Sequence, residues 1–361
     1  MLIFYSLFYI PIILLLISIV LPEFKSILLF TCVVFLVLMC GLRGQIDQDN
    51  LNYQRAFSFM NYYSDMFTPK MMEPMTVIIV VFCKNIFENN YNHQIIFFIY
   101  ALFAIILKML FFSKYSDNKY IWLSVLIYIS SYFLVQEMTQ IRAGLSAAIL
   151  LFSLSDLYNK SYFKFLTKVL LASLFHYSSL IYLLLVFVNI ENVNKSKIFW
   201  LILSFFIFAI LGVNQFVIGN LSFGYGNKIT AYVDLSNIVK SPAYRIYFSC
   251  FNIKTLFIVY VLFNLIKYQK NLVMHNKQTV LFIKVLFLGL LIQIGLSGFD
   301  EMSLRFSDFF YLVAGVCFTW LFRVKKSHSE LYLVFSLFCV YSIFEKVILI
   351  KSFNLSLGYF G

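Results

Sequence analysis

Long apolar runs occupy most of this chain, and they constrain its fold more than any motif does. A run of about 20 apolar residues can cross the hydrocarbon core of a bilayer as a helix, because a helix satisfies its own backbone polar groups. Runs that are long enough to span, or nearly so, lie at about 2–21, 26–41, 94–113, 120–135, 143–158, 164–190, 197–213, 252–268, 278–297, 307–322 and 330–350. The composition, 62% hydrophobic and 12% charged, lies outside the range of soluble domains. The sequence therefore predicts an all-α, polytopic integral membrane protein with about 10–12 transmembrane helices.

Polar sequence is too scarce for a separate soluble domain, so residues 1–361 are predicted to form a single transmembrane domain. Lysine and arginine gather in some of the loops, and the positive-inside rule assigns such loops to the cytoplasm. These basic loops are 108–119, 160–168, 195–197, 267–277 and 323–326. The remaining polar loops are then external: 42–74 and 214–251, which are the two large ones, together with 136–142 and 298–306.

Two apolar segments do not fit a simple span. Residues 75–87 are too few to cross comfortably and are expected to form a re-entrant segment. Residues 164–190 are numerous enough for one tilted helix or for two short helices that meet near His176. The assignment of the polar loops to the external side depends on both segments returning the chain to the side on which it entered.

Arg142 and His176 interrupt sequence that is otherwise apolar enough for a bilayer. An ionisable residue at membrane depth costs at least a few kcal/mol unless it faces protein or water, so it is a candidate functional residue. At 100° per residue, a continuous helix would place Gln136 and Gln140 on one face and Arg142 on another, so all three serve one ligand only if the helix breaks. The structural alternative for His176 is a histidine satisfied by a backbone carbonyl.

The loop 42–74 concentrates polar side chains. They are Arg43, Asp47, Asp49, Tyr53, Arg55, Asp65 and Glu73. A helix beginning near Asp49 would place Asp49 and Tyr53, four residues apart, on one face. The alternative is an amphipathic segment that lies in the headgroup layer without a catalytic role.

A second polar cluster follows the run 278–297. Glu301, Arg305 and Asp308 recur at helical spacing in the sequence GFDEMSLRFSD. They are candidate site residues, and the structural alternative is an ion pair between Glu301 and Arg305.

No cofactor is expected for this chain. The sequence contains no HExxH or DxD motif, and its six cysteines form no CxxC pair, so neither a catalytic metal nor a disulfide framework is expected. The net charge of +12 is explained by basic cytoplasmic loops that face anionic lipid, and nothing suggests a nucleic-acid partner.

Several of these residues, in this order, resemble the EpsG-type family of bacterial polysaccharide polymerases, which is related in role to the Wzy O-antigen polymerases. The resemblance is specific around 42–74 and 136–185. The matching residues are Leu42, Arg43, Asp49 and Tyr53 in an L-R-Y-x-x-G-T-D-Y-x-x-Y element, the pair Glu73-Pro74, Ile141, Arg142 and Leu145 in I-R-Q-x-L-A, the segment around His176 in A-S-x-F-H-x-S-A, and Arg305 with Phe309 in R-x-x-x-Y/F. The departures are Asp47, Gln48 and Asn50 in the first element and Ala143 in place of a glutamine.

The resemblance implies a glycosyltransferase that joins polyprenyl-pyrophosphate-linked oligosaccharide repeat units at the outer face of the cytoplasmic membrane. In this reading Arg142 and Arg305 are the leading pyrophosphate ligands, with Arg43 third, because a guanidinium binds phosphate oxygens as a planar fork. Asp49 or His176 is the base that activates the acceptor hydroxyl. Tyr53, Glu73 and Gln136 are the expected sugar contacts. A chain-length regulator and other polysaccharide-assembly proteins are the implied protein partners.

Two other classes of protein remain as alternatives. A lipid-linked oligosaccharide flippase would also be polytopic with interior charge, and internal repeats would favour it. A membrane O-acyltransferase would use His176 as its catalytic residue and should place an Asn or Asp partner for it on another helix.

Overall fold

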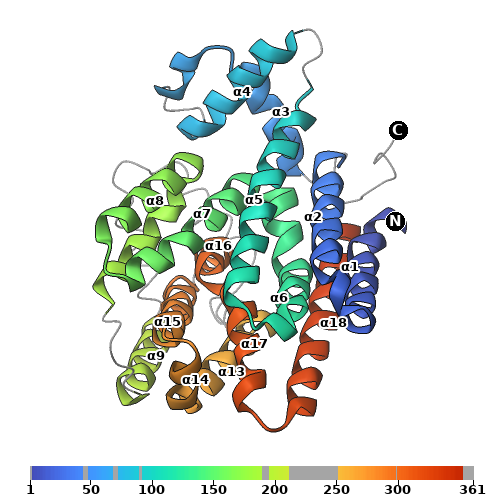
Figure 1. Cartoon of the computed structure of the whole chain (residues 1–361). Helices are drawn as coiled ribbons and strands as arrows, with labels where there is room; N and C mark the ends of the chain where they lie inside the picture. The colour runs from blue at the N-terminus through green and yellow to red at the C-terminus, as the bar shows by residue number, and fades with distance from the viewer. Residues whose placement is uncertain are drawn as a thin grey trace. The chain divides into compact units, whose positions relative to one another are not determined.

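The computed structural model describes residues 2–43, 48–67, 72–88, 92–188, 195–210, 251–297 and 299–352, and the regular secondary structure of these residues is helical throughout (Figure 1). The all-α fold class is therefore confirmed. The chain divides into two compact units, Met1–Leu183 with Phe335–Gly361, and Leu184–Val334. Of the predicted external loop 214–251, all but the last residue lies outside the described residues.

The first unit contains most of the site residues predicted from the sequence. Its helical elements are α1 (Leu2–Val20), η1 (Pro22–Phe24), α2 (Lys25–Gly41), α3 (Gln48–Phe59), η2 (Tyr63–Phe67), α4 (Pro74–Phe87), α5 (Gln94–Tyr115), η4 (Asn118–Tyr120), α6 (Ile121–Tyr128), η5 (Ile129–Thr139), α7 (Ile141–Tyr158) and α8 (Tyr162–Phe175), followed by most of η6 (Tyr177–Phe187).

The second unit carries Arg305. Its elements are α9 (Lys195–Ile210), α13 (Ile253–Lys267), α14 (Gln269–His275), α15 (Thr279–Gly295), α16 (Asp300–Tyr311), α17 (Ala314–Val324) and the start of α18 (His328–Ser352), whose residues from Phe335 onward belong to the first unit.

Several described helices are long and apolar enough to cross a membrane. Four meet the criterion singly, and a fifth span is possible if the bent pair Met302–Tyr311 and Ala314–Val324, which meet at 47°, counts as one. The four are Pro22–Gly41, Gln94–Tyr115, Asn118–Thr139 and Ile141–Tyr158. The prediction of about 10–12 transmembrane helices also counted runs that form shorter helices in the described part of the chain, such as 278–297, which contains the helix Thr279–Gly295. By the composition of its helices, the chain is a multi-pass membrane protein.

The irregular segments follow the pattern of the sequence. Of the two alternatives for 164–190, the structure has the two short helices: α8 ends at Phe175, His176 is extended (φ −157°, ψ 114°), and the tighter helix η6 follows. The segment 75–87 forms α4, a helix of 14 residues. The helices α4, α8 and η6, of 14, 14 and 11 residues, are each shorter than an ordinary span.

Lys108 differs from its expected position in a cytoplasmic loop. It lies within α5, it is 0% exposed, and it forms an ion pair with Glu137. The basic character of the 108–119 loop therefore rests on Lys114 and Lys119. A lysine near the end of an apolar run carries no sequence signal that separates a loop residue from a buried partner of a carboxylate.

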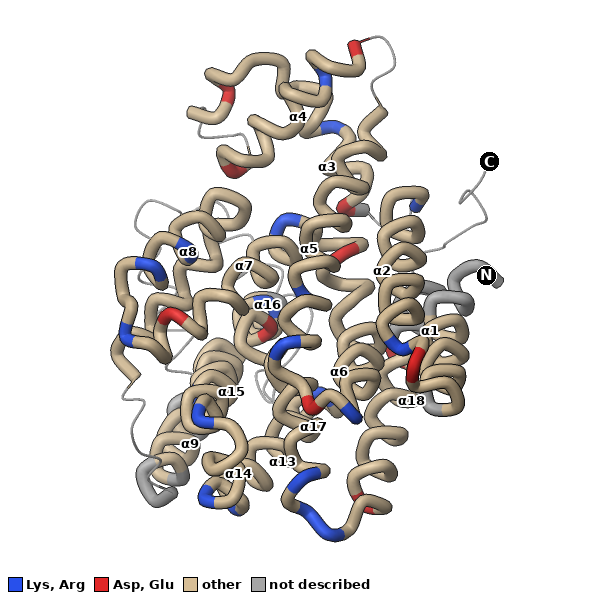
Figure 2. The backbone as a smooth tube through the Cα atoms, in the orientation of Figure 1, with Lys and Arg blue, Asp and Glu red and all other residues tan. Residues whose placement is uncertain are grey.

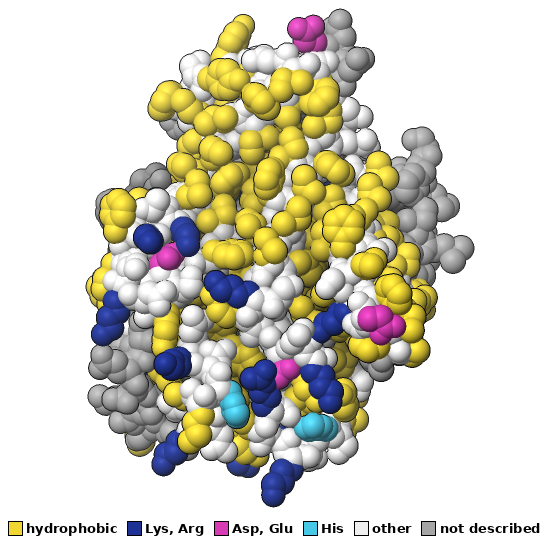
Figure 3. All heavy atoms as spheres, viewed as in Figure 1, with side chains coloured by type: hydrophobic (Ala, Val, Ile, Leu, Met, Phe, Trp, Pro, Cys, Tyr) yellow, Lys and Arg dark blue, Asp and Glu magenta, His cyan; other side chains and the backbone are white. Residues whose placement is uncertain are grey.

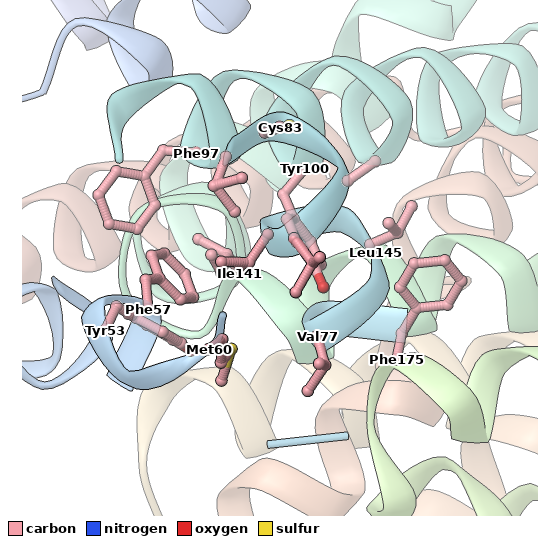
Figure 4. Packing of buried hydrophobic residues seen from close by; sticks show 14 of the residues in the cluster. Tyr53, Phe57, Met60, Val77, Cys83, Phe97, Tyr100, Ile141, Leu145 and Phe175 are labelled. Carbon is pink, nitrogen blue, oxygen red and sulfur yellow. The ribbon is translucent and has the colours of Figure 1, made fainter. Parts of the chain in front are cut away.

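Five helices of the first unit, α3, α4, α5, α7 and α8, share one apolar core (Figure 4). Phe57 and Met60 contribute from the α3 segment, Phe97 and Tyr100 from α5, and Leu145 from α7, all of them buried. The Tyr100 hydroxyl also forms a 2.8 Å hydrogen bond with Thr76 of α4. This core holds together the helix ends that carry the polar residues described below.

The surface of the first unit around α3 and α4 is apolar. On the face shown in Figure 3, hydrophobic side chains cover these two helices and much of α5. Phe59 is 68% exposed and Tyr62 is 71% exposed. The helices of both units carry few charged positions along their length (Figure 2). This surface is typical of a protein that faces lipid.

Candidate active site

The carboxylate of Glu73 contacts both of the ionisable residues that interrupt the apolar sequence. Its Oε2 forms an ion pair with Nη1 of Arg142, and its Oε1 lies 2.9 Å from Nδ1 of His176. Arg142 and His176 lie 69 and 103 residues from Glu73 along the chain. The fold therefore assembles one acid–arginine–histidine cluster from three separate segments.

Each member of this cluster sits at the end of a helix. Glu73 immediately precedes α4, and Pro74 occupies the first position of that helix, where a missing N–H and a fixed φ are tolerated. Arg142 is the second residue of α7, and His176 follows the last residue of α8. Helix ends place reactive side chains beside a rigid scaffold without interrupting the scaffold itself.

A hydrogen bond between helices sets the register of Arg142 relative to His176. The Ser146 hydroxyl of α7 donates to the carbonyl oxygen of Ala172 on α8 at 3.0 Å. Ser146 lies one turn after Arg142, and Ala172 lies one turn before His176. Both ends of this bond are buried, so the two helices cannot slide past each other without leaving a polar group unsatisfied.

Tyr53 of α3 completes the cluster. Its hydroxyl accepts a 3.5 Å hydrogen bond from Nε of Arg142, and the guanidinium carbon lies 5.4 Å from the centre of its ring. The ring packs against Phe57 and Phe97 in the core. Glu73 and Tyr53 therefore hold the guanidinium of Arg142 through two different nitrogens, which fixes the orientation of its plane.

The electrostatics keep Glu73 ionised. Burial alone would raise the pKa of its carboxyl, but the hydrogen bond from His176 and the charge of Arg142 outweigh burial and lower the pKa to about 2. The Glu73 side chain is 6% exposed, whereas those of Arg142 and His176 are 23% and 24% exposed. Glu73 thus lies behind the other two residues, which can reach a bound molecule.

The hydrogen-bond network also assigns the protonation of His176. An ionised carboxylate accepts hydrogen bonds, so Nδ1 of His176 carries the proton that it donates to Glu73. In the neutral ring the basic lone pair then resides on Nε2. A carboxylate that orients an imidazole in this way is the arrangement used by histidine general bases.

Three other predicted site residues lie near the cluster without joining it. Arg43 is buried, with its guanidinium carbon 4.0 Å from the centre of the Phe97 ring. Gln136 is also buried, and its side-chain oxygen accepts a 2.7 Å hydrogen bond from Lys108. Asp49 lies in the first turn of α3, one helical turn before Tyr53. The sugar and phosphate roles of these residues stay predictions.

Arg305 belongs to the second unit and is described there by itself. It is exposed on α16. Asp308, one turn further along α16, pairs with Lys254 of α13. The alternative ion pair of Arg305 with Glu301 lies outside the described residues, because the Glu301 side chain is not among them.

Two ion-pair partners, Glu137 and Lys254, were not predicted from the sequence. They form buried or partly buried ion pairs with Lys108 and Asp308. The available signal was a charged residue within or beside an apolar run, the same signal that singled out Arg142.

A glycine allows the helix break before Arg142. The segment η5 is π-helical, Gln140 leaves helical geometry (φ −101°, ψ 53°), and α7 begins at the next residue. A Cβ at Gly144 would lie 2.2 Å from the carbonyl oxygen of Gln136. Only glycine therefore lets the first turn of α7 pack directly on η5. The helix also breaks between Gln136 and Arg142, as it must if both residues serve one ligand.

The variant Gly144→Ala is expected to destabilise the protein at or above the upper end of the about 1–3 kcal/mol that overpacking costs, because the clash is with backbone. The matched control is Gly295→Ala, where the added Cβ would meet only the Phe205 ring, at 3.2 Å. The measurement is the thermal unfolding midpoint of each purified variant in detergent. A Gly144→Ala midpoint equal to that of Gly295→Ala would contradict the assigned packing.

Comparison with known proteins is informative at the level of the family. The sequence profile of the EpsG family matches residues 26–359, which is nearly the whole chain. No curated protein and no solved structure matches the chain. The profile covers Arg43, Asp49, Tyr53, Glu73, Gln136, Arg142, His176 and Arg305. The resemblance drawn from individual motifs is thereby confirmed, and the chain belongs to the EpsG family, a family linked to polysaccharide biosynthesis.

Proposed function

We propose that this protein is a polysaccharide polymerase that joins polyprenyl-pyrophosphate-linked oligosaccharide repeat units at the outer face of the bacterial cytoplasmic membrane, for O-antigen, capsule or exopolysaccharide synthesis. The observation that carries the proposal is the Glu73 carboxylate, which holds an arginine and a histidine side by side in a multi-pass protein of the EpsG family. A chain-length regulator and other assembly proteins are its proposed partners.

The proposed reaction needs a base and a cation. A hydroxyl of one repeat unit attacks the anomeric carbon of a second, so that a new carbon–oxygen bond forms as the bond to the pyrophosphate breaks. Nε2 of His176 accepts the hydroxyl proton, and the bonding electron pair leaves with the polyprenyl pyrophosphate. Glu73 orients the imidazole and stabilises it while it is protonated.

Arg142 is the proposed cation for the departing pyrophosphate. Its Nη1 and Nε are engaged by Glu73 and Tyr53, which leaves the Nη2 edge as the part of the guanidinium that can bind phosphate oxygens. Preorganised charge of this kind, aimed at the position where negative charge develops, is usually the largest catalytic contribution. Arg43, Asp49 and Gln136 are proposed as supporting residues of the substrate site. Arg305 stays a proposed phosphate ligand on the ground of its family motif alone.

The proposed external site predicts the membrane topology of the first unit. In a background that lacks the six native cysteines, a cysteine at the exposed Ser58 of α3 should react with an impermeant thiol reagent in intact cells. A cysteine at the exposed Asn159, which follows α7, should react only after permeabilisation. The reverse pattern would place the Glu73 cluster on the cytoplasmic side and would contradict external polymerisation.

A deletion strain separates the polymerase from the other two classes. Loss of a polymerase leaves single repeats on the carrier lipid or the cell surface, whereas loss of a flippase removes all surface repeats. Loss of an O-acyltransferase leaves full-length chains that lack acetyl groups. The structure gives His176 a glutamate partner, Glu73, where an Asn or Asp was expected for this class. The proposal predicts single repeats, restored to long chains by the wild-type gene.

A further inference from the structure

A buried network of charged and polar residues lies beside the Glu73 cluster, in the same unit. Lys108 of α5 pairs with Glu137 of η5 and also donates to the Gln136 side chain at 2.7 Å. Glu137 Oε1 accepts a 2.8 Å hydrogen bond from the Tyr128 hydroxyl, and the Glu137 carbonyl oxygen accepts one from Arg43 at 3.4 Å. Lys108 is 0% exposed and Glu137 is 1% exposed.

Stability alone does not account for this network. Removing two charges from water costs more than their attraction returns unless the geometry is very good, and apolar replacements of a buried ion pair are often neutral or stabilising. The Lys108–Glu137 pair has a structural effect as well, because it connects α5 to the π-helical segment η5. Such segments are uncommon and occur frequently at functional sites.

The held segment determines where α7 starts. The first turn of α7 packs directly on the Gln136 carbonyl at Gly144. A Cβ at Gly144 would lie 2.2 Å from that oxygen and 3.0 Å from Oε2 of Glu137. Arg142 lies between the helix break at Gln140 and Gly144. A shift of Gln136 or Glu137 must therefore shift the backbone that carries Arg142.

A second route connects the network to the other side of the guanidinium. Arg43, which donates to the Glu137 carbonyl, stacks on the Phe97 ring at 4.0 Å from its centre. Phe97 packs edge-on against Tyr53 with ring centres 6.1 Å apart, and Tyr53 receives the hydrogen bond from Arg142 Nε. The network therefore touches both the backbone before Arg142 and the aromatic residue beside it.

We propose that Lys108 and Glu137 are positioning residues, which place Arg142 against Glu73 and Tyr53 by holding the helix break between η5 and α7. The placement itself follows from the contacts above, while its consequence for turnover rests on the proposed function of Arg142. Lys108 and Glu137 are buried and touch no bound molecule in this account. They act on the reaction only through Arg142.

The test uses the full-length protein with both charges removed together. The variant Lys108→Met/Glu137→Gln removes both charges of the pair, whereas either single variant would leave one of them buried without its partner and lower the yield of folded protein. A cysteine at the half-buried Ala143, next to Arg142, reports local geometry through its rate of reaction with a maleimide in purified protein lacking native cysteines. A cysteine at the exposed Asn159 reports the far end of α7.

We expect the double variant to change the labelling rate at position 143 by about threefold or more while the rate at position 159 stays the same. The matched control removes a different ion pair, Asp156 of α7 with Lys168 of α8 at 2.5 Å, as Asp156→Asn/Lys168→Met, and should leave the rate at position 143 unchanged. Equal rates at position 143 with and without the Lys108–Glu137 pair would overturn the proposal. Changes at both positions would overturn it as well, because they would indicate general loosening.

An activity measurement tests the action through Arg142. In a double-mutant cycle, neutralising the Lys108–Glu137 pair should lower turnover about tenfold or more in the wild-type background, since misplacing a catalytic group by about 1 Å can cost about 10²-fold. The same change should have little further effect when Arg142 is already lysine. Losses that multiply would contradict the proposal. The labelling result depends on no reaction, so a failure of the proposed polymerase activity would leave it standing.

Discussion

Replacing His176 with asparagine is expected to lower the rate of polymerisation about 10²–10⁴-fold, the usual contribution of a general base, without lowering the amount of protein in the membrane. Asparagine is smaller than histidine but can place an amide N–H near the position of Nδ1 and so keep the hydrogen bond to Glu73, and it has no basic nitrogen. The expected product is lipid-linked single repeats in place of a ladder of chains. The measurement compares polymer ladders with protein amount in membranes supplied with the native repeat unit.

The matched comparison is Asp49→Asn, because Asp49 is the other residue expected from the sequence to act as the base. The structure places Asp49 one turn from Tyr53, and it places His176 in direct contact with Glu73. We therefore expect the larger loss at His176. A normal ladder from His176→Asn would exclude His176 as the base, and loss of protein together with loss of the ladder would support a structural role for His176.

The variant Arg142→Lys is expected to lower turnover about 10²–10³-fold although it keeps the positive charge, the range found when one preorganised donor is removed from a transition state. The guanidinium contacts Glu73 through one nitrogen and Tyr53 through another, and its third nitrogen is the one proposed to bind a phosphate. One ammonium group cannot make these three contacts in the same geometry. Steady-state kinetics with the lipid-linked donor would measure the loss.

Two further lysine variants serve as comparisons for Arg142→Lys. Arg55→Lys changes an exposed arginine of α3 that is outside the cluster, and it should leave turnover unchanged. Arg305→Lys is expected to lower turnover as well, if Arg305 is the second phosphate ligand. Wild-type rates from both Arg142→Lys and Arg305→Lys would mean that these arginines act as structural residues or as simple charges, and the assigned roles would fail.

Part of the candidate site followed from the sequence because ionisable residues are conspicuous in apolar surroundings. Arg142 and His176 were singled out in this way, and Tyr53 and Glu73 by the concentration of polar side chains in the loop 42–74 and by the resemblance to family motifs. Their mutual contact was not predictable from spacing, since it joins segments 69 and 103 residues apart through tertiary packing. The break at His176 was one of two alternatives for a run too long for one ordinary span.

Other features escaped the sequence for physical reasons. The faces of Gln136 and Arg142 were compared on a continuous helix, whereas the backbone is π-helical in η5 and leaves the helix at Gln140. The periodicity of apolar residues does not predict such a break, which depends on the absence of a side chain at Gly144. Lys108 resembled a loop lysine because its partner, Glu137, lies 29 residues away on another helix.

Reconstitution tests the central claim, polymerisation of lipid-linked repeat units, most directly. Carrier-lipid extract from the deletion strain supplies the native repeat unit, and the purified wild-type protein or the His176→Asn variant is incorporated into liposomes with this extract. We expect a ladder of lengthening chains and release of polyprenyl pyrophosphate with the wild-type protein, and single repeats with the variant. A wild-type protein that inserts normally, yet only moves the lipid-linked repeat across the bilayer or acylates it, would contradict the proposed polymerase function.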